Sequence, residues 1–192
     1  MLFRDLVTKC RSCRRFDGSH QLEGALLRDL VELASFAPSA KNLQPLKYIA
    51  LSDPVSVAAL FPLLSWAGYL ADWPGPREDE RPTAFLVMLG DSRISRDFGC
   101  DSGIAAQTIM LGATYAGLGG CMITAIDRKK ARAELRIPEH FEILMVIALG
   151  LPRETVVIDR MAGEDSVRYY RDLHAIHHVP KRTVDEILLD FN

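Results

Sequence analysis

Three arginines and a serine lie close together in RSCRRF, residues 11–16, directly after a helix predicted over residues 2–10. Arginine offers planar pairs of N–H donors that match phosphate oxygens, and a serine hydroxyl adds another hydrogen bond. Arg11, Ser12 and Arg14 could therefore form half of an anion cradle. The same residues would also suit an ordinary basic helix end, which the helix dipole favours.

A second basic pair lies near the other end of the chain, in HVPKR. Lys181 and Arg182 follow a proline that restricts the backbone, and they precede a short helix that Thr183 should cap. If this pair converges with the N-terminal arginines, the two clusters would neutralise one phosphate monoester, which carries a charge of about −1.5 to −2.

Three glycines lie in YAGLGGCMI, residues 115–123, where a predicted helix ends and an apolar strand begins. Gly117 is suited to the left-handed position that closes a helix. Gly119 and Gly120 could let the backbone approach a flat ligand closely. A purely structural role for the motif, as the cap that ends the helix, is an equally good interpretation.

The polar loop APSAKNLQP, residues 37–45, separates a predicted helix from a predicted strand. Its two prolines restrict the backbone, while Ser39, Asn42 and Gln44 supply donors and acceptors of both kinds. A planar heterocycle with alternating carbonyl and N–H edges needs such a rim. These residue types are also common in turns and helix caps.

A metal or redox-dithiol site is the rival interpretation, because Cys10 and Cys13 have Cys-x-x-Cys spacing. A structural zinc site usually needs a second pair, which Cys100 and Cys121 do not form. A redox pair would begin a helix, whereas this one follows a helix. We therefore expect no metal site and interpret the histidines of the C-terminal region, His174, His177 and His178, as strand residues.

Hydrophobic patterning predicts the elements that position these groups. Unbroken apolar runs predict strands covered on both faces, and a helical period predicts an amphipathic helix over residues 22–36 that Pro38 ends. The expected strands are KYIALSD, TAFLVMLGD and EILMVIALG, and a further helix enters through Pro54. Helices and strands alternate irregularly, which indicates an α+β domain rather than a regular βαβ array.

One helix, from about Asp101 to Ala116, carries small residues all round and no evident solvent face. We expect it to be packed on several sides, including across a subunit boundary. A Pro-, Gly- and charge-rich excursion at about 62–82 and a polar arm at about 166–192 extend a single domain over residues 1–192. The arm would fold poorly alone and is expected to wrap a partner subunit.

Composition narrows the classes of partner. The chain is 48% hydrophobic and 25% charged with a net charge of −2, and its longest basic run is three residues. Nucleic acid is therefore excluded as an expected partner. No run approaches the roughly 20 apolar residues that cross a bilayer, and charges interrupt the N-terminus where a secretory signal would be apolar. We expect a cytoplasmic protein with no membrane partner.

Taken in order, RSCRRF, APSAKNLQP, GIAAQTIMLGATYAGLGGCMI, ALGLP and VPKR resemble the nitroreductase family of FMN-dependent oxidoreductases over nearly the whole chain. The resemblance implies an α+β sandwich with a central, mostly antiparallel sheet flanked by helices, in an intertwined homodimer. It also implies electron transfer from NAD(P)H through flavin N5 to a small organic acceptor such as a nitro compound or quinone, with no catalytic side chain.

The resemblance also implies which residues bind FMN. Arg11, Ser12 and Arg14 would bind the phosphate and ribityl chain together with Lys181 and Arg182. The polar loop of the other subunit would contact the flavin through Pro38, Ser39, Ala40 and Asn42. Gly119 and Gly120 would lie along the ring. The donor near flavin N1 and O2 is not identified.

Two positions depart from the usual family pattern: Cys10 stands where a second basic residue is common, and Leu46 where a tryptophan is common. Leu46 is still apolar, but its smaller size weakens the analogy with nitroaromatic reduction. Two alternatives remain open, namely a non-catalytic flavin-binding or sensing module and a flavin dehalogenase or enone reductase.

Overall fold

A computed structural model describes residues 1–161 and 166–189 of the 192-residue chain. The chain divides into two compact units, which are described separately. The first comprises Met1–Trp66 and Gly75–Arg153, and the second comprises Ala67–Pro74 with the chain from Glu154 onward. Among the described residues, every helix is too short or too polar to cross a membrane.

A four-stranded antiparallel sheet forms the centre of the first unit. Its order is β1-β2-β4-β3, with every neighbouring pair antiparallel. The strands span Leu46–Leu51 (β1), Ala84–Asp91 (β2), Gly119–Ile123 (β3) and Phe141–Gly150 (β4). The prediction of an α+β fold around a mostly antiparallel sheet is confirmed.

Strand β2 is buried along its whole length. Successive side chains of a strand point to opposite faces of the sheet, so Leu86 and Met88 enter one hydrophobic core while Phe85 and Val87 enter the other. The unbroken apolar run predicted from the sequence therefore reflects a sheet covered on both faces.

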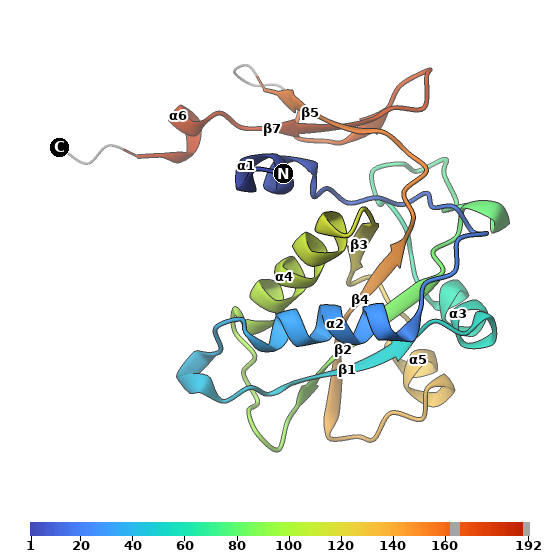
Figure 1. Ribbon diagram of the computed structural model, residues 1–192, viewed down its shortest axis with the longest axis vertical. Helices are drawn as coiled ribbons and strands as arrows, with labels where there is room; N and C mark the ends of the chain where they lie inside the picture. Colours follow the sequence, from blue (N-terminus) through green and yellow to red (C-terminus); the bar gives the residue numbers. More distant parts are fainter. Residues whose placement is uncertain (162–165, 190–192) are drawn as a thin grey trace. The chain divides into compact units, whose positions relative to one another are not determined.

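Helices cover both faces of the sheet. Figure 1 shows α2 (Gly24–Ser35) and α4 (Asp101–Tyr115) side by side over it, and both contribute to the core that contains Leu86. Helices α3 (Pro54–Leu60) and α5 (Arg128–Glu134) contribute to the other core. The remaining helical elements of this unit are α1 (Phe3–Lys9) and the single turns η1 (Ala40–Asn42), η2 (Phe61–Leu63) and η3 (Glu78–Glu80).

Helix α2 is amphipathic, as the sequence predicts. Leu27 and Leu30 are buried, whereas Leu33 is 41% exposed. Leu33 lies at the edge of the stripe, where its Cδ1 packs over Gly112 of α4 at 2.7 Å from the position a Cβ would take. The absence of a side chain at Gly112 thus lets α2 close onto α4.

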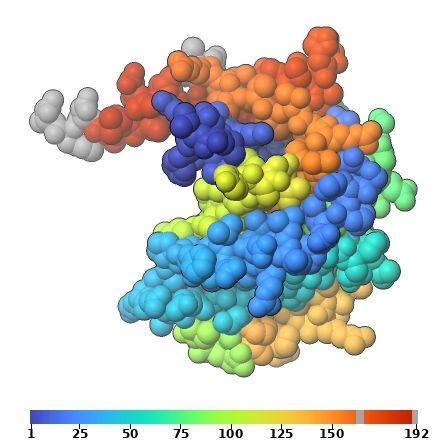
Figure 2. Space-filling model, in the orientation of Figure 1, coloured from blue at the N-terminus to red at the C-terminus, as the bar shows by residue number. Residues whose placement is uncertain are grey.

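Within this chain α4 does have an exposed face, contrary to the sequence prediction. Ile104 is 39% exposed, and Gly103 and Gln107 are exposed beside it. Figure 2 shows α4 (yellow) reaching the surface between α2 and α1. The apolar side chains of Leu2 and Phe3, at the start of α1, are likewise exposed.

The second unit contains its own three-stranded sheet, in the order β5-β7-β6. Strand β5 (Val156–Arg160) pairs parallel to β7 (His177–Lys181), and β6 (Tyr170–Arg171) pairs antiparallel to β7, followed by the short helix α6 (Val184–Ile187). The predicted polar arm therefore contributes β6, β7 and α6 to this unit. Its last residues, 190–192, lie outside the described residues.

Candidate functional site

The N-terminal arginine segment lies against the glycine strand β3. Ser12 forms a parallel bridge with Gly120, and the Cys13 backbone N–H donates to the Gly120 carbonyl at 2.8 Å. Two of the segments predicted to bind one cofactor, residues 11–14 and residues 119–120, are thus neighbours in the fold.

Arg11 folds back over the end of α1. Its Nε donates to the Cys10 carbonyl at 2.6 Å and its Nη2 to the Val7 carbonyl at 3.1 Å, which satisfies carbonyls that a helix end leaves unpaired. Within the described residues its Nη1 makes no hydrogen bond. The side chain is therefore oriented while part of its donor capacity stays available, and the adjacent Ser12 is exposed.

Arg15, also in this segment, has a structural partner. Its Nη2 donates to the buried carboxylate of Glu80, and this hydrogen bond lowers the pKa of Glu80. Arg15 thereby fixes the segment to the η3 turn, while Arg14 beside it is half-buried. Arg15 therefore has a positioning role, and the binding role of Arg14 stays a prediction.

Packing alone explains why positions 119 and 120 are glycines. A Cβ on Gly119 would lie 2.9 Å from the Cys13 Cβ, and a Cβ on Gly120 would lie 2.7 Å from the Met110 Sδ. Both glycines are buried in β3. Their contact with a flavin ring stays a prediction, but their role in seating Cys13 follows directly from these distances.

Gly117 ends α4 as the sequence predicts. Its φ of 81° is left-handed, its N–H donates to the Thr114 carbonyl, and the Leu118 N–H donates to the Ala113 carbonyl. These two bonds form a Schellman motif, which satisfies carbonyls at the helix end. The motif directs the chain into β3 at the point where β3 meets Ser12.

The polar loop is anchored at the first residue of α4. The Ser39 hydroxyl donates to Asp101 Oδ2 at 2.5 Å, and the Ala40 N–H donates to Asp101 Oδ1 at 3.0 Å. The Gln44 N–H in turn donates to the Ser39 hydroxyl at 2.9 Å. Asp101 is buried, and sequence reasoning missed it because an acidic residue in the first helical turn is usually explained by the helix dipole.

The loop backbone is strained. Lys41, Asn42 and Gln44 all have left-handed φ values between 51° and 54°. Each non-glycine residue in this region costs about 1–2 kcal/mol, although asparagine tolerates it better than most. The loop therefore needs contacts that hold it in this conformation, and Pro38, Ala40 and Asn42 remain exposed on its surface.

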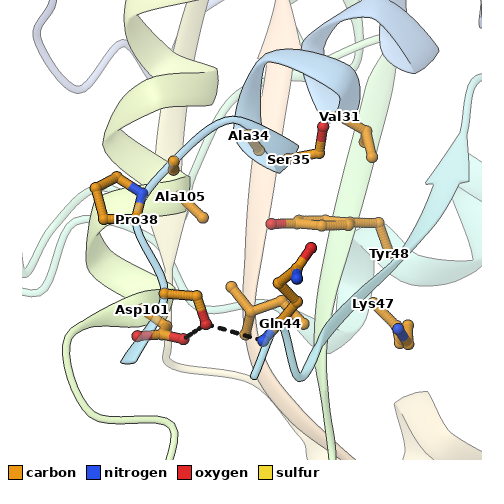
Figure 3. A pocket seen from close by; sticks show the side chains of 12 residues that line it. Val31, Ala34, Ser35, Pro38, Gln44, Lys47, Tyr48, Asp101 and Ala105 are labelled. Carbon is orange, nitrogen blue, oxygen red and sulfur yellow. Dashed lines mark hydrogen bonds between the residues drawn. The ribbon is translucent and has the colours of Figure 1, made fainter. Parts of the chain in front are cut away.

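A cavity of about 410 Å³ lies behind the loop, walled by α2, the start of β1 and the start of α4. Figure 3 shows the Tyr48 ring projecting across it, with Gln44 and Asp101 nearby. Burial raises the pKa of Tyr48 to about 12. Because the inner side of the loop faces this cavity rather than packed side chains, the position of the loop depends on its hydrogen bonds to Asp101.

The loop and the arginine segment lie toward opposite ends of α4. Ser39 and Ala40 contact its first residue, whereas Ser12 pairs with Gly120, beyond its last residue. A 15-residue helix is about 22 Å long. One chain therefore presents the two predicted halves of a flavin site at separate places.

The C-terminal basic pair belongs to the second unit. Lys181 ends β7, and Arg182 Nη1 lies 3.7 Å from Glu186 Oε1. Thr183 begins α6 as predicted, because its N–H and hydroxyl both donate to Glu186 Oε2, at 2.7 and 3.0 Å. The convergence of Lys181 and Arg182 with the N-terminal arginines stays a prediction.

The residues considered for a metal or redox-dithiol site, among them Cys10, Cys13 and His178, are held in the fold by packing or hydrogen bonds. Cys10 and Cys13 are buried, and none of the four cysteines, all within the described residues, forms a disulfide. The described part of the chain contains no group of three or more His, Cys, Asp and Glu side chains placed to hold a metal ion. His178 lies between Asp159 and Asp172 in the second unit, at 3.0 and 3.4 Å.

Fold and site together define an α+β protein with a helix-covered antiparallel sheet and a basic segment beside a glycine strand. The profile of the nitroreductase family matches residues 7–74 and 77–151. The chain belongs to the nitroreductase family. An NADH dehydrogenase of Thermus thermophilus is 28% identical over 175 residues, covering 76% of this chain and 84% of that protein.

Solved structures share the fold. A nitroreductase-like protein from Streptococcus mutans superposes with a TM-score of 0.70 at 17% identity, covering 99% of this chain and 98% of that one. An FMN-dependent nitroreductase from Clostridium difficile R20291 has a TM-score of 0.64 at 24% identity, covering 83% and 91% of the respective chains.

Proposed function

We propose that this protein is an FMN-dependent oxidoreductase that passes electrons from NAD(P)H to a small organic acceptor such as a nitro compound or quinone. Membership of the nitroreductase family supports oxidoreductase activity. The name of the Thermus relative supports a nicotinamide donor, and the description of the Clostridium structure supports FMN.

The observation that carries the proposal is the pairing of Ser12 and Cys13 with Gly120. It places the backbone of the segment that carries Arg11, Ser12 and Arg14 beside a buried glycine strand. A phosphate monoester needs charge-assisted donors, which Arg11, Ser12 and Arg14 can supply. The donor set therefore fits the phosphate end of FMN.

When bound, FMN supplies the redox chemistry, with hydride from NAD(P)H entering at N5 and electrons leaving to the acceptor. The protein's residues bind and orient. Arg11 and Arg14 would hold the phosphate, and Ser12 would add a hydroxyl bond. The polar loop would exclude water from one edge of the ring. No side chain needs to act as a general acid or base in this scheme.

A homodimer follows from the same proposal. Because the loop and the arginine segment lie toward opposite ends of α4, a loop from a second copy would complete the site. The uncovered apolar side chains Leu2, Phe3 and Ile104 support an interface involving α1 and α4. Lys181 and Arg182 would join the phosphate site in the assembled dimer.

Absorbance spectroscopy tests the cofactor directly. The recombinant protein is expected to purify yellow or to take up added FMN, and NADH or NADPH should bleach the bound flavin under anaerobic conditions. Steady NAD(P)H oxidation with a quinone or nitro compound would then distinguish an enzyme from a flavin-storing module. A colourless protein that takes up no added FMN would refute the proposal.

Substitution of Arg14 tests the phosphate site. A hydrogen bond to a charged group contributes about 1.5–3 kcal/mol, so R14A should raise the Kd for FMN about 10- to 100-fold. Lys129, an exposed cation on α5, provides the charge-matched control K129A, which should leave the Kd unchanged. Riboflavin, which lacks the phosphate, should bind both variants equally.

A further inference from the structure

We infer that Asp101 is a positioning residue that holds the flavin-contacting loop in place through Ser39, and that Ser39 is part of this brace rather than a flavin ligand. The inference rests on the proposed function, since it concerns the site of the same cofactor. It assigns a role to a buried carboxylate at the start of α4, far in sequence from the loop.

The hydroxyl of Ser39 is already occupied on both sides. It donates its hydrogen to Asp101 Oδ2 at 2.5 Å and accepts the Gln44 N–H at 2.9 Å. A hydroxyl has one hydrogen to donate. The Ser39 hydroxyl therefore has no hydrogen left to donate to the carbonyl edge of a flavin, although the loop that it fixes can still reach one.

Asp101 anchors the middle of the loop, residues 38–44, whereas the loop's two ends are held by backbone bonds, from the Ala37 N–H to the Ala34 carbonyl and from the Asp91 N–H to the Pro45 carbonyl. Other bonds of residues 38–44 stay inside the loop, from the Asn42 N–H to the Ser39 carbonyl, from the Leu43 N–H to the Ala40 carbonyl, and from Gln44 Nε2 to the Asn42 carbonyl. Across the described residues, the bonds that leave this segment both end on the two oxygens of Asp101.

The strained backbone and the cavity make this link necessary. Three left-handed residues, Lys41, Asn42 and Gln44, disfavour the observed loop, and the cavity behind it gives the loop space into which it can relax. A carboxylate with two acceptor oxygens holds both the Ser39 hydroxyl and the Ala40 N–H. An amide at this position can accept through its single oxygen only.

The brace leaves the Asn42 side chain to meet the ring. Asn42 is exposed, and its side-chain amide makes no hydrogen bond to any described residue. An amide offers both a donor and an acceptor, which matches the alternating edge of a flavin. Asp101 and Ser39 would therefore act on loop order, whereas Asn42 would act on the ligand.

Two readouts separate these roles, namely the Kd for FMN and tryptic cleavage after Lys41 in the FMN-free protein. We expect D101N and S39A each to raise the Kd about tenfold and to speed cleavage after Lys41 severalfold. N42D keeps a residue type that tolerates the left-handed backbone but removes the amide donor, so it should raise the Kd without the faster cleavage that loss of the brace produces. S39T keeps the hydroxyl and should restore both values toward those of the wild type.

D91N is the matched control, because Asp91 is a second buried carboxylate whose side chain is bonded to Arg93 instead. Cleavage after Lys129 gives an internal reference, and thermal unfolding shows that each variant is folded. Wild-type cleavage after Lys41 in both D101N and S39A would overturn the inference, as would an unchanged Kd in both.

The outcomes also distinguish this inference from the proposed function. A wild-type chain that takes up no FMN would refute the proposed function, and the cleavage assay would then decide by itself whether the brace exists. A chain that binds FMN equally well with and without the Asp101 carboxylate would leave the proposed function standing and reject the brace.

Discussion

Replacement of Gly119 by alanine should weaken both the fold and the cofactor site. The added Cβ would lie 2.9 Å from the Cys13 Cβ, 3.0 Å from the Cys13 Sγ and 3.2 Å from the Pro152 Cβ. Forcing an extra methyl into a packed region costs about 1–3 kcal/mol. Reduced freedom of the unfolded chain returns about 0.4–1 kcal/mol. We therefore expect a net loss of about 1–2 kcal/mol in the free energy of unfolding.

The same substitution should impair FMN binding, because Cys13 would have to move and Ser12 and Arg14 flank it. Urea unfolding of the FMN-free protein measures the stability loss, and fluorescence titration with FMN measures the Kd. G24A is the control, since a Cβ on Gly24 has only one neighbour, at 4.0 Å. Its free energy of unfolding should equal or exceed that of the wild type, by up to about 1 kcal/mol, because the reduced freedom of the unfolded chain is not opposed by a clash.

A second substitution identifies the clash. C13G deletes both Cys13 atoms that the new methyl would approach, so G119A should cost less in the C13G background than in the wild type. The coupling free energy between the two positions should reach about 1 kcal/mol. If G119A unfolds like the wild type, or if the two substitutions are simply additive, the packing argument for Gly119 is wrong.

Three further predictions concern other parts of the chain. G117A should lower the free energy of unfolding in urea by about 1 kcal/mol, because its φ of 81° is left-handed although no atom lies within 4 Å. Hydrogen bonds to Asp159 and then Asp172 raise the pKa of His178 in the folded protein above its ordinary value of 6.5. Protonated His178 therefore stabilises the fold fully below about pH 6.5, and this stabilisation is lost as the pH rises through the raised pKa of the folded protein. Unfolding measured between about pH 5 and 8 should show this loss, and H178Q should abolish it. I104E should convert the proposed dimer to a monomer by light scattering, and a monomeric wild type would contradict the dimer itself.

Local sequence determined the elements because their signals depend on near neighbours. The unbroken apolar run of β2 predicted a strand covered on both faces, and Pro54 begins α3 as expected. Gly117 closes α4, and Thr183 begins α6. Each feature depends on dihedral preference or side-chain period over a few residues. The order of the motifs was likewise enough to indicate the nitroreductase family.

Distant pairings could not be predicted in this way. Arg15 and Glu80 are 65 residues apart, and Ser39 and Asp101 are 62 residues apart. Nothing in the sequence distinguished Arg15 from its neighbours Arg11 and Arg14, or a hydroxyl at Ser39 that faces a ligand from one that faces the fold, whereas the structure gives Arg15 an ion pair and bonds the Ser39 hydroxyl to Asp101. The first pair depends on how the N-terminal segment meets η3 and the second on how the loop meets α4, and no local pattern records that packing.

The sequence by itself determined the main helices and the strands of the first unit, and which residue types could bind a phosphate and a flat ring, whereas it did not predict β5 or β6, and His174, expected in a strand, lies in a turn. Only the tertiary structure decided which of those residues are committed to the fold and which keep unused donors. The physical reason is that a hydrogen-bond donor can be used once, and its partner is chosen by the three-dimensional packing of segments that lie far apart in the chain.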